Sequence, residues 1–142
     1  MSEAAEQGHV VVEHTADSGI EAWARDLPGL FVEAAAAMFE LMYEAKAAGD
    51  VEAAIVVEVG ADSVEELLVA WLSELLFVSE TRDLALSVFE VDQISPTSLR
   101  GRTGGPTAGR VGATGPPIKA VTYHGLLIEH DTTWRARVIF DV

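Results

Sequence analysis

The chain has 142 residues, 49% of them hydrophobic, no cysteine and a formal net charge of −14. This length fits one domain with a sizeable core, and the missing cysteine excludes disulfides, thiolate metal sites and cysteine nucleophiles. The negative charge argues against unaided binding of nucleic acid, because lysine and arginine are needed to hold a phosphate backbone.

The first two elements are predicted to be short strands. Residues 9–14 are rich in β-branched valine, and small or branched apolar residues occupy every second position over residues 20–25, which is typical of half-buried strands. Aspartate and glycine within residues 16–19 favour a turn between the two strands.

A helix and then a strand are predicted next. Asp26 has the side chain of a helix cap, and Pro28 is tolerated in a first turn. Apolar residues recur at helical spacing over residues 27–41, and we expect this helix to end near Gly49. The β-branched run within residues 51–59 predicts the strand.

A second helix should start at Asp62 or Ser63. Each is followed three residues later by a glutamate, Glu65 or Glu66, whose carboxylate can satisfy free amides at a helix start. The apolar stripe that follows, over residues 67–76, is wide, and its width indicates burial against a sheet.

Several strands follow the second helix. Alternation returns over residues 84–91, and residues 97–102 can pair with them. Residues 101–117 hold six of the 12 glycines, three of the five prolines and no acidic residue, so we expect a mobile loop at a hairpin tip there. Three strands close the chain, over residues 118–124, 126–130 and 134–142.

This order of elements predicts an α+β fold in which two main helices pack on a mixed, largely antiparallel sheet. We expect residues 1–142 to form a single domain that carries a flexible, glycine- and proline-rich loop at about residues 101–117.

The start of the chain and its apolar runs indicate its location in the cell, and its charge distribution bears on its partners. Residues 1–8 contain no apolar run, unlike a secretion signal, and no stretch reaches the roughly 18 apolar residues of a membrane helix. We therefore expect a soluble, cytoplasmic protein with no membrane partner.

Residues 1–92 carry 20 acidic and 3 basic residues, whereas residues 93–142 carry 3 acidic and 6 basic residues. The acidic part can be a solvated surface, or it can dock a basic partner or collect divalent cations.

Motifs of the common hydrolases are missing from the sequence. It contains neither His-Glu-x-x-His nor Gly-x-Ser-x-Gly, so a zinc protease and a serine hydrolase are both unsupported. The histidines are His9, His14, His124 and His130, and a histidine on a strand usually makes structural hydrogen bonds.

Two acidic positions are candidates for a metal site. A strand that ends in a turn presents His14 and Asp17 together, and the chain finishes on Asp141 and Val142. If that turn lay beside the terminus, the two aspartates and the α-carboxylate would converge, a set of hard oxygen ligands that suits calcium, magnesium or manganese. Asp17 could equally cap its own turn.

Longer motifs run along nearly the whole chain. They are residues 13–17 (EHTAD), 19–22 (GIEA), 26–27 (DL), 30–35 (LFVEAA), 38–42 (MFELM), 66–68 (ELL), 71–76 (WLSELL), 118–124 (IKAVTYH), Trp134 and 138–142 (VIFDV). In these motifs and in their order, the sequence resembles the archease family. It departs from the usual family pattern at residues 101–117, which are glycine-rich here.

The resemblance implies an accessory protein rather than an enzyme. Archeases activate a GTP- and manganese-dependent RNA-splicing ligase by promoting its guanylylation and multiple turnover, in tRNA splicing and RNA repair. The ligase is thus the implied partner, and RNA is contacted only through it.

The resemblance also implies which residues act. It places a divalent cation on Asp17, Asp141 and the main-chain or terminal oxygens of Val142, with calcium as the first expectation and magnesium or manganese as alternatives. His14 also belongs to a matching motif and is a candidate for contact with the partner. No residue is implied to be catalytic.

Lys119, Tyr123 and His124 of a second motif, residues 118–124, match the family as well. Lys119 and His124 are further candidates for contact with the ligase. A surface hydrogen bond for His124 and strand packing for Tyr123 are equally compatible with the sequence.

Two other functions remain open from the sequence. A small divalent-metal-dependent hydrolase could use the same cation to activate water, with His14 as the apparent general base. An RNA-binding or chaperone module would draw on the basic residues of residues 93–142.

Overall fold

The computed structural model describes residues 7–13, 18–43, 51–113 and 115–142. Its elements, in chain order, are β1 (Gly8–Glu13), β2 (Ser18–Ala24), α1 (Leu27–Met42), β3 (Ile55–Gly60), α2 (Val64–Arg82), β4 (Val88–Ser95), β5 (Ser98–Gly104), the short 3-10 helix η3 (Ala108–Arg110), β6 (Ala120–Val121), β7 (Leu127–His130) and β8 (Trp134–Asp141).

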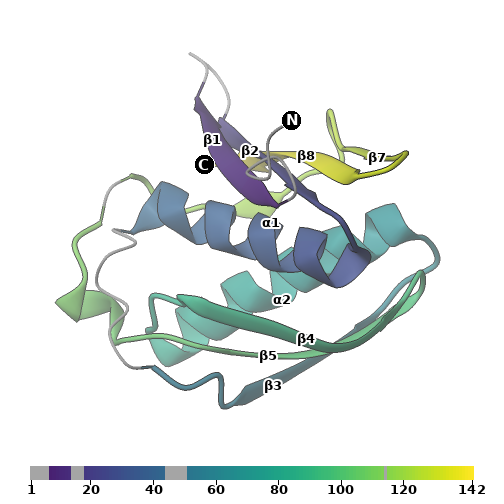
Figure 1. Cartoon of the computed structure of the whole chain (residues 1–142). Coiled ribbons are helices and arrows are strands. Elements are labelled where there is room, and N and C mark those ends of the chain that lie inside the picture. The colour runs from purple at the N-terminus through teal and green to yellow at the C-terminus, as the bar shows by residue number, and fades with distance from the viewer. Residues whose placement is uncertain (1–6, 14–17, 44–50, 114) are drawn as a thin grey trace.

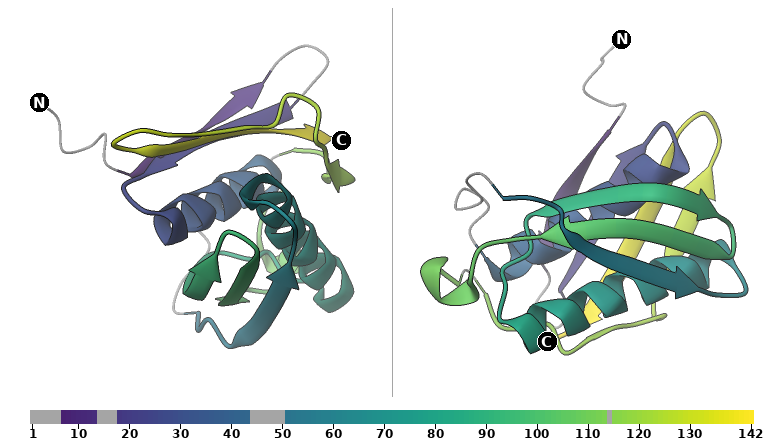
Figure 2. Two further views of the ribbon diagram at one scale, coloured as in Figure 1. Left: turned by 90° about the vertical axis from the view of Figure 1, so that its right-hand side faces the viewer. Right: turned by 90° about the horizontal axis from the view of Figure 1, so that it is seen from below.

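Within the described residues the strands form two sheets, and the helices lie between them (Figure 1). The first sheet has the order β1-β2-β8-β6, with β7 also paired to β8, and the second has the order β3-β5-β4. Helix α1 contacts β1, β2 and β8 of the first sheet and β4 of the second, whereas α2 contacts β6, β3 and β5. The two further views show the same three layers (Figure 2).

The predicted α+β class, with two main helices and antiparallel strands, is confirmed, and every described strand pair is antiparallel. The strands divide between two sheets, whereas the sequence predicted one. The reason lies in the helices: adjacent residues of α1, such as Met38 and Phe39 or Leu41 and Met42, are all buried. Neighbouring side chains on a helix point about 100° apart, so α1 must be covered on more than one side.

Helix starts follow the predicted chemistry. Asp26 caps α1, and its carboxylate accepts a hydrogen bond from the Gly29 N–H at 2.8 Å. Of the two alternatives for α2, the structure has Ser63 as the cap: its hydroxyl accepts from the Glu66 N–H at 3.2 Å. The Glu66 carboxylate in turn accepts from the Asp62 N–H at 3.0 Å. This reciprocal pair satisfies two amides that the helix itself leaves free.

Helix α1 ends earlier than predicted. The sequence indicated an end near Gly49, which lies outside the described residues, but Tyr43 already has extended backbone angles (φ −138°, ψ 158°). Tyr43 forms an isolated β-bridge with Ala113. Pairing with a distant segment therefore takes the chain out of the helix.

Strand boundaries differ most from the prediction in two places. Residues 84–87, predicted as strand, precede β4 and run beside residues 104–107, with the Ala85 N–H donating to the Pro106 carbonyl at 2.8 Å. Of residues 118–124, only Ala120–Val121 form a strand, because the chain turns where the Leu126 N–H donates to the Tyr123 carbonyl at 3.2 Å.

The segment over residues 101–117 is not the tip of a hairpin. Its first four residues complete β5, and the rest crosses from the second sheet to β6 of the first. Thr103 is fully buried, and a Cβ on Gly105 would clash with the backbone carbonyl oxygen of Ala85. Several glycines here therefore permit close packing of backbones. From composition alone, the same glycines indicated a flexible loop.

Among the helices that the structure describes, none combines the length and the hydropathy that a membrane span requires.

The crossover predicts a contrast between two glycines. Gly105→Ala should destabilise the fold by about 1–3 kcal/mol, because the added methyl overlaps the Ala85 backbone. Gly109→Ala is the matched control, since a Cβ there meets nothing within 4 Å, and its effect should stay within about 0.5 kcal/mol. Urea unfolding of the two variants measures both values, and equal stability would contradict this account of the segment.

Candidate metal site at one end of the first sheet

Four strand ends meet at one end of the first sheet. Ser18, the first residue of β2, pairs with Glu13 at the end of β1 and with Phe140 near the end of β8. Asp141 pairs with Ala120 at the start of β6. The chain's C-terminus therefore lies at this end of the sheet (Figure 2), beside the start of β2.

Backbone hydrogen bonds anchor the last residues of the chain. The Lys119 N–H donates to the Asp141 carbonyl at 2.7 Å, and the Thr122 N–H donates to the Ile139 carbonyl at 3.1 Å. The Thr122 hydroxyl donates to the same carbonyl at 3.1 Å. Phe140 is buried, whereas Asp141 is exposed. The tail is thus fixed through its main chain while the Asp141 side chain is open to solvent.

The predicted ligands divide between described and undescribed parts of the chain. Asp141 and Val142 are both exposed at this end of the sheet, but Asp17 lies outside the described residues. It immediately precedes Ser18, whose pairing with Phe140 is given above. Over the ranges that the structure describes, no group of three or more acidic or histidine side chains is placed to hold a metal ion.

The donors available at this end suit a hard cation. The oxygen donors that the described residues offer there include the Asp141 carboxylate and the oxygens of Val142, while the main-chain carbonyl of Asp141 accepts from Lys119. Oxygen atoms of this kind are the ligands that calcium and magnesium prefer. The described half of the predicted site is therefore chemically compatible with such an ion.

The second motif borders the same end of the sheet. Lys119 is exposed and its backbone is bonded to Asp141. His124 is exposed as well, and Tyr123 is 60% exposed, so strand packing of Tyr123 is wrong. His14 lies outside the described residues. Lys119 and His124 are accessible to a partner.

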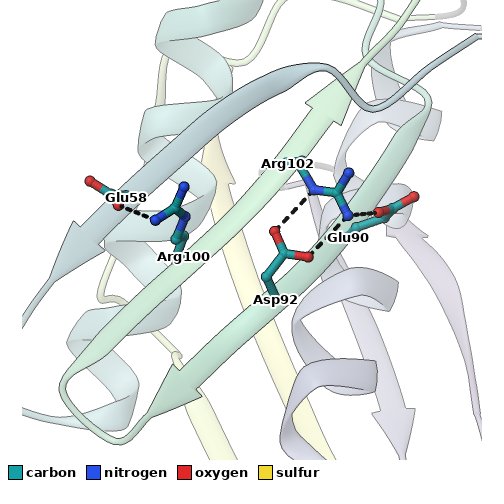
Figure 3. Close-up of polar contacts among 5 residues, drawn as sticks. All are labelled: Glu58, Glu90, Asp92, Arg100 and Arg102. Atoms are coloured by element: carbon teal, nitrogen blue, oxygen red, sulfur yellow. Dashed lines mark hydrogen bonds and ion pairs between the residues drawn. The ribbon is translucent and has the colours of Figure 1, made fainter.

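Basic side chains on the second sheet are engaged with acidic ones (Figure 3). Arg102 of β5 donates from Nε to Asp92 at 3.0 Å and from its terminal nitrogen to Glu90 at 2.5 Å. The hydrogen bond from Arg102 holds the pKa of the Asp92 carboxyl below its usual value. Arg100 lies 3.6 Å from the Glu58 carboxylate.

These ion pairs bear on the RNA-binding alternative. Arg137 of β8 also lies near an acid, 3.8 Å from the Glu21 carboxylate. Three of the six basic residues in residues 93–142 therefore face acidic partners, which lowers their attraction for phosphate. The positive charge of this part of the chain is therefore partly neutralised.

The tail anchor can be tested through Thr122. Thr122→Val removes the hydroxyl that donates to Ile139 and should cost about 1 kcal/mol of unfolding free energy in urea. Thr132→Val in the β7–β8 turn is the control, because the Thr132 hydroxyl makes no hydrogen bond within the described residues, and it should leave stability nearly unchanged. A loss no larger for Thr122→Val than for Thr132→Val would argue against the anchor.

Sequence comparison identifies relatives over most of the chain. Residues 10–142 match the model of the archease protein family (MTH1598/TM1083). The chain is 35% identical to the protein archease of Methanopyrus kandleri over 136 residues, which cover 92% of this chain and 96% of the relative. It is 34% identical to the protein archease of Methanothermobacter thermautotrophicus over 142 residues, covering 96% and 99%.

Solved structures agree in fold. The solution structure of protein 1598 from Methanobacterium thermoautotrophicum superposes with a TM-score of 0.70 at 32% identity, covering 95% of this chain and 99% of that one. A crystal structure from Thermotoga maritima, described as an archease and possible chaperone, gives a TM-score of 0.61 at 18% identity, covering 92% and 94%. At that identity the second likeness supports the fold alone. From the family match and these relatives, the chain belongs to the archease family.

Proposed function

We propose that this chain is an accessory protein that activates an RNA-splicing ligase in tRNA splicing and RNA repair. In this proposal it promotes guanylylation and multiple turnover of the ligase and catalyses no reaction itself. The ligase is GTP- and manganese-dependent, and RNA is met only through it. Membership of the archease family supports the proposal, and so does the architecture at one end of the first sheet.

The proposed working part is a divalent-cation site on Asp17, Asp141 and Val142. One observation carries it: the register that sets Ser18 opposite Phe140. Each of these two residues is a sequence neighbour of a proposed aspartate ligand, so the backbone of β2 and β8 supports a shared site. Converging carboxylates repel one another unless a cation offsets their charge.

Exposure supports a role toward another protein. Asp141, Lys119 and His124 are all open to solvent, whereas a catalytic site for small molecules is usually a concave, partly apolar pocket. A cation held on an exposed rim can be presented to a partner. In nucleotidyl transfer, metal ions bridge and neutralise phosphate charge, so placing an ion or ordering the ligase pocket is a physical route to faster guanylylation.

The distribution of charge also favours a protein partner, one with a basic surface. The excess of acidic residues lies in residues 1–92, which contain Asp17. Long-range attraction between such a surface and a basic protein speeds their encounter and weakens as salt increases.

The activator proposal predicts a selective loss in aspartate variants. Asp17→Asn and Asp141→Asn should each reduce ligase guanylylation to the rate of the ligase alone, because each removes one anionic ligand. Asp62→Asn, which changes an exposed aspartate just before α2, should stimulate like the unaltered chain. Guanylylation is followed with purified ligase and labelled GTP, and circular dichroism checks that each variant is folded.

Folded Asp17→Asn and Asp141→Asn variants that stimulate normally would refute the role of the site. Turnover of nucleotides or phosphoesters by the metal-loaded chain alone would instead favour the hydrolase. Tight binding of tRNA without the ligase, at moderate salt, would favour the RNA-binding module.

The cation site also predicts a binding result that needs no ligase. Calorimetric titration with calcium should give one ion per chain, with affinity reduced at least about tenfold in Asp141→Asn, since affinity follows the number of charged ligands. Asp62→Asn should bind as the unaltered chain does. Equal calcium affinity in all three proteins would place the ion elsewhere, and parallel titrations with magnesium and manganese rank the metals.

A further inference from the structure

His9 of β1 lies between two carboxylates of helix α1. Its Nδ1 is 2.6 Å from Oε1 of Glu33, and its Nε2 is 2.7 Å from Oε2 of Glu40. Gln7 donates from Nε2 to the second oxygen of Glu33 at 2.8 Å. The His9 and Glu33 side chains are each 18% exposed and the Glu40 side chain is 37% exposed, so the contacts are partly shielded from water, the one with Glu33 more than the one with Glu40.

With both carboxylates ionised, the two contacts fit a doubly protonated ring. A neutral imidazole has one N–H and one lone pair, so with both carboxylates ionised it could donate to only one, and its lone pair would face the other. Burial alone lowers the pKa of His9, but the hydrogen bonds and negative charge of Glu33 and Glu40 outweigh burial and raise that pKa above the usual 6.5. The carboxylates approach opposite ring nitrogens, so the three groups are not arranged around one metal ion.

The surroundings of His9 contain no competing charge among the described contacts. Strand β2 sets Ala22 opposite His9, and the neighbour on the side of the N-terminus, Gln7, is neutral. Among the described residues, the titratable groups that face the ring are Glu33 and Glu40, both from α1.

Strand β1 is an edge strand, so few elements hold it in place. Within the described residues it pairs with β2 alone. Val11 packs against the core, but Val10 is 45% exposed, so apolar contacts hold one side of the strand only. Ion pairs shielded from water are stronger than those at the surface.

We propose that protonated His9 is a pH-dependent clamp that fastens edge strand β1 to helix α1. Because the folded pKa is raised, the stabilisation is fully present below the ordinary histidine pKa and is lost as pH rises through the folded value. Residues 14–17 follow β1 directly in the sequence, so the clamp acts on the strand that leads into the His-Thr-Ala-Asp motif. The clamp does not depend on the proposed function.

Hydrogen exchange of backbone amides tests the clamp in the full chain. Protection factors of the β1 amides should fall about tenfold between about pH 6 and about pH 9, beyond the change in intrinsic exchange rate, because charge-assisted hydrogen bonds are lost. In His9→Gln the low protection should be present at both pH values. Strand β3 is the internal control, since it is also an edge strand, and its protection should not follow this pattern.

An NMR titration of the His9 ring supplies the second readout. Its midpoint should lie above 6.5 in the unaltered chain and fall in Glu40→Gln, and the loss of β1 protection should move to lower pH with it. This pair of measurements stands even if His9→Gln fails to fold. Protection of β1 that does not change with pH, or that changes equally in His9→Gln, would overturn the proposal.

Discussion

The pairing of β2 with β8 is the constraint on which the rest of the first sheet depends. It joins residues near the start of the chain to residues near its end and places Ile20 opposite Val138 and Ala22 opposite Ala136. All four side chains are buried against the helices. A slip of one residue would turn the apolar side chains of the shifted strand to solvent, so core packing selects one register. That register also determines which residues meet at the end of the sheet.

The helix layer supports the first sheet from one side. Trp71 of α2 is fully buried, and its indole N–H donates to the Phe31 carbonyl of α1 at 3.0 Å. The hydrogen bond ties the two helices together between the sheets. Phe140, one residue before Asp141, is buried, so the tail continues directly from the core. An exposed carboxylate on such a strand is held more rigidly than one on a free terminus.

Local chemistry was the most predictable part of the fold. The caps at Asp26 and Ser63 depend on one side chain and the amides beside it, which neighbouring residues reveal. Two features depend on distant contacts and were not predictable: the bridge from Tyr43 to Ala113 that ends α1, and the second sheet that covers the helices. The prediction of a loop at a hairpin tip over residues 101–117 failed for the same reason. Gly105 lies close against the backbone of Ala85, a contact that composition does not reveal.

The candidate site could be predicted in part. The sequence alone does not tell how far the first turn lies from the end of the chain. The pairing of β2 with β8 places Ser18 opposite Phe140, and these two residues adjoin Asp17 and Asp141 in the sequence. Asp17 and His14 stay predictions, since they lie outside the described residues. The role of His9 as a bridge between Glu33 and Glu40 depends on two residues 24 and 31 positions away, although a strand histidine in a structural hydrogen bond was expected.

The central claim is that Asp17 and Asp141 share one cation, and paramagnetic broadening by manganese tests it most directly. Substoichiometric Mn²⁺ should broaden the amide resonances of residues 15–19 and 139–142 together in the unaltered chain. Asp141→Asn should abolish the broadening at residues 15–19, and Asp17→Asn should abolish it at residues 139–142. Broadening that persists at either segment when the other segment's aspartate is replaced would show that the two residues do not hold the same ion.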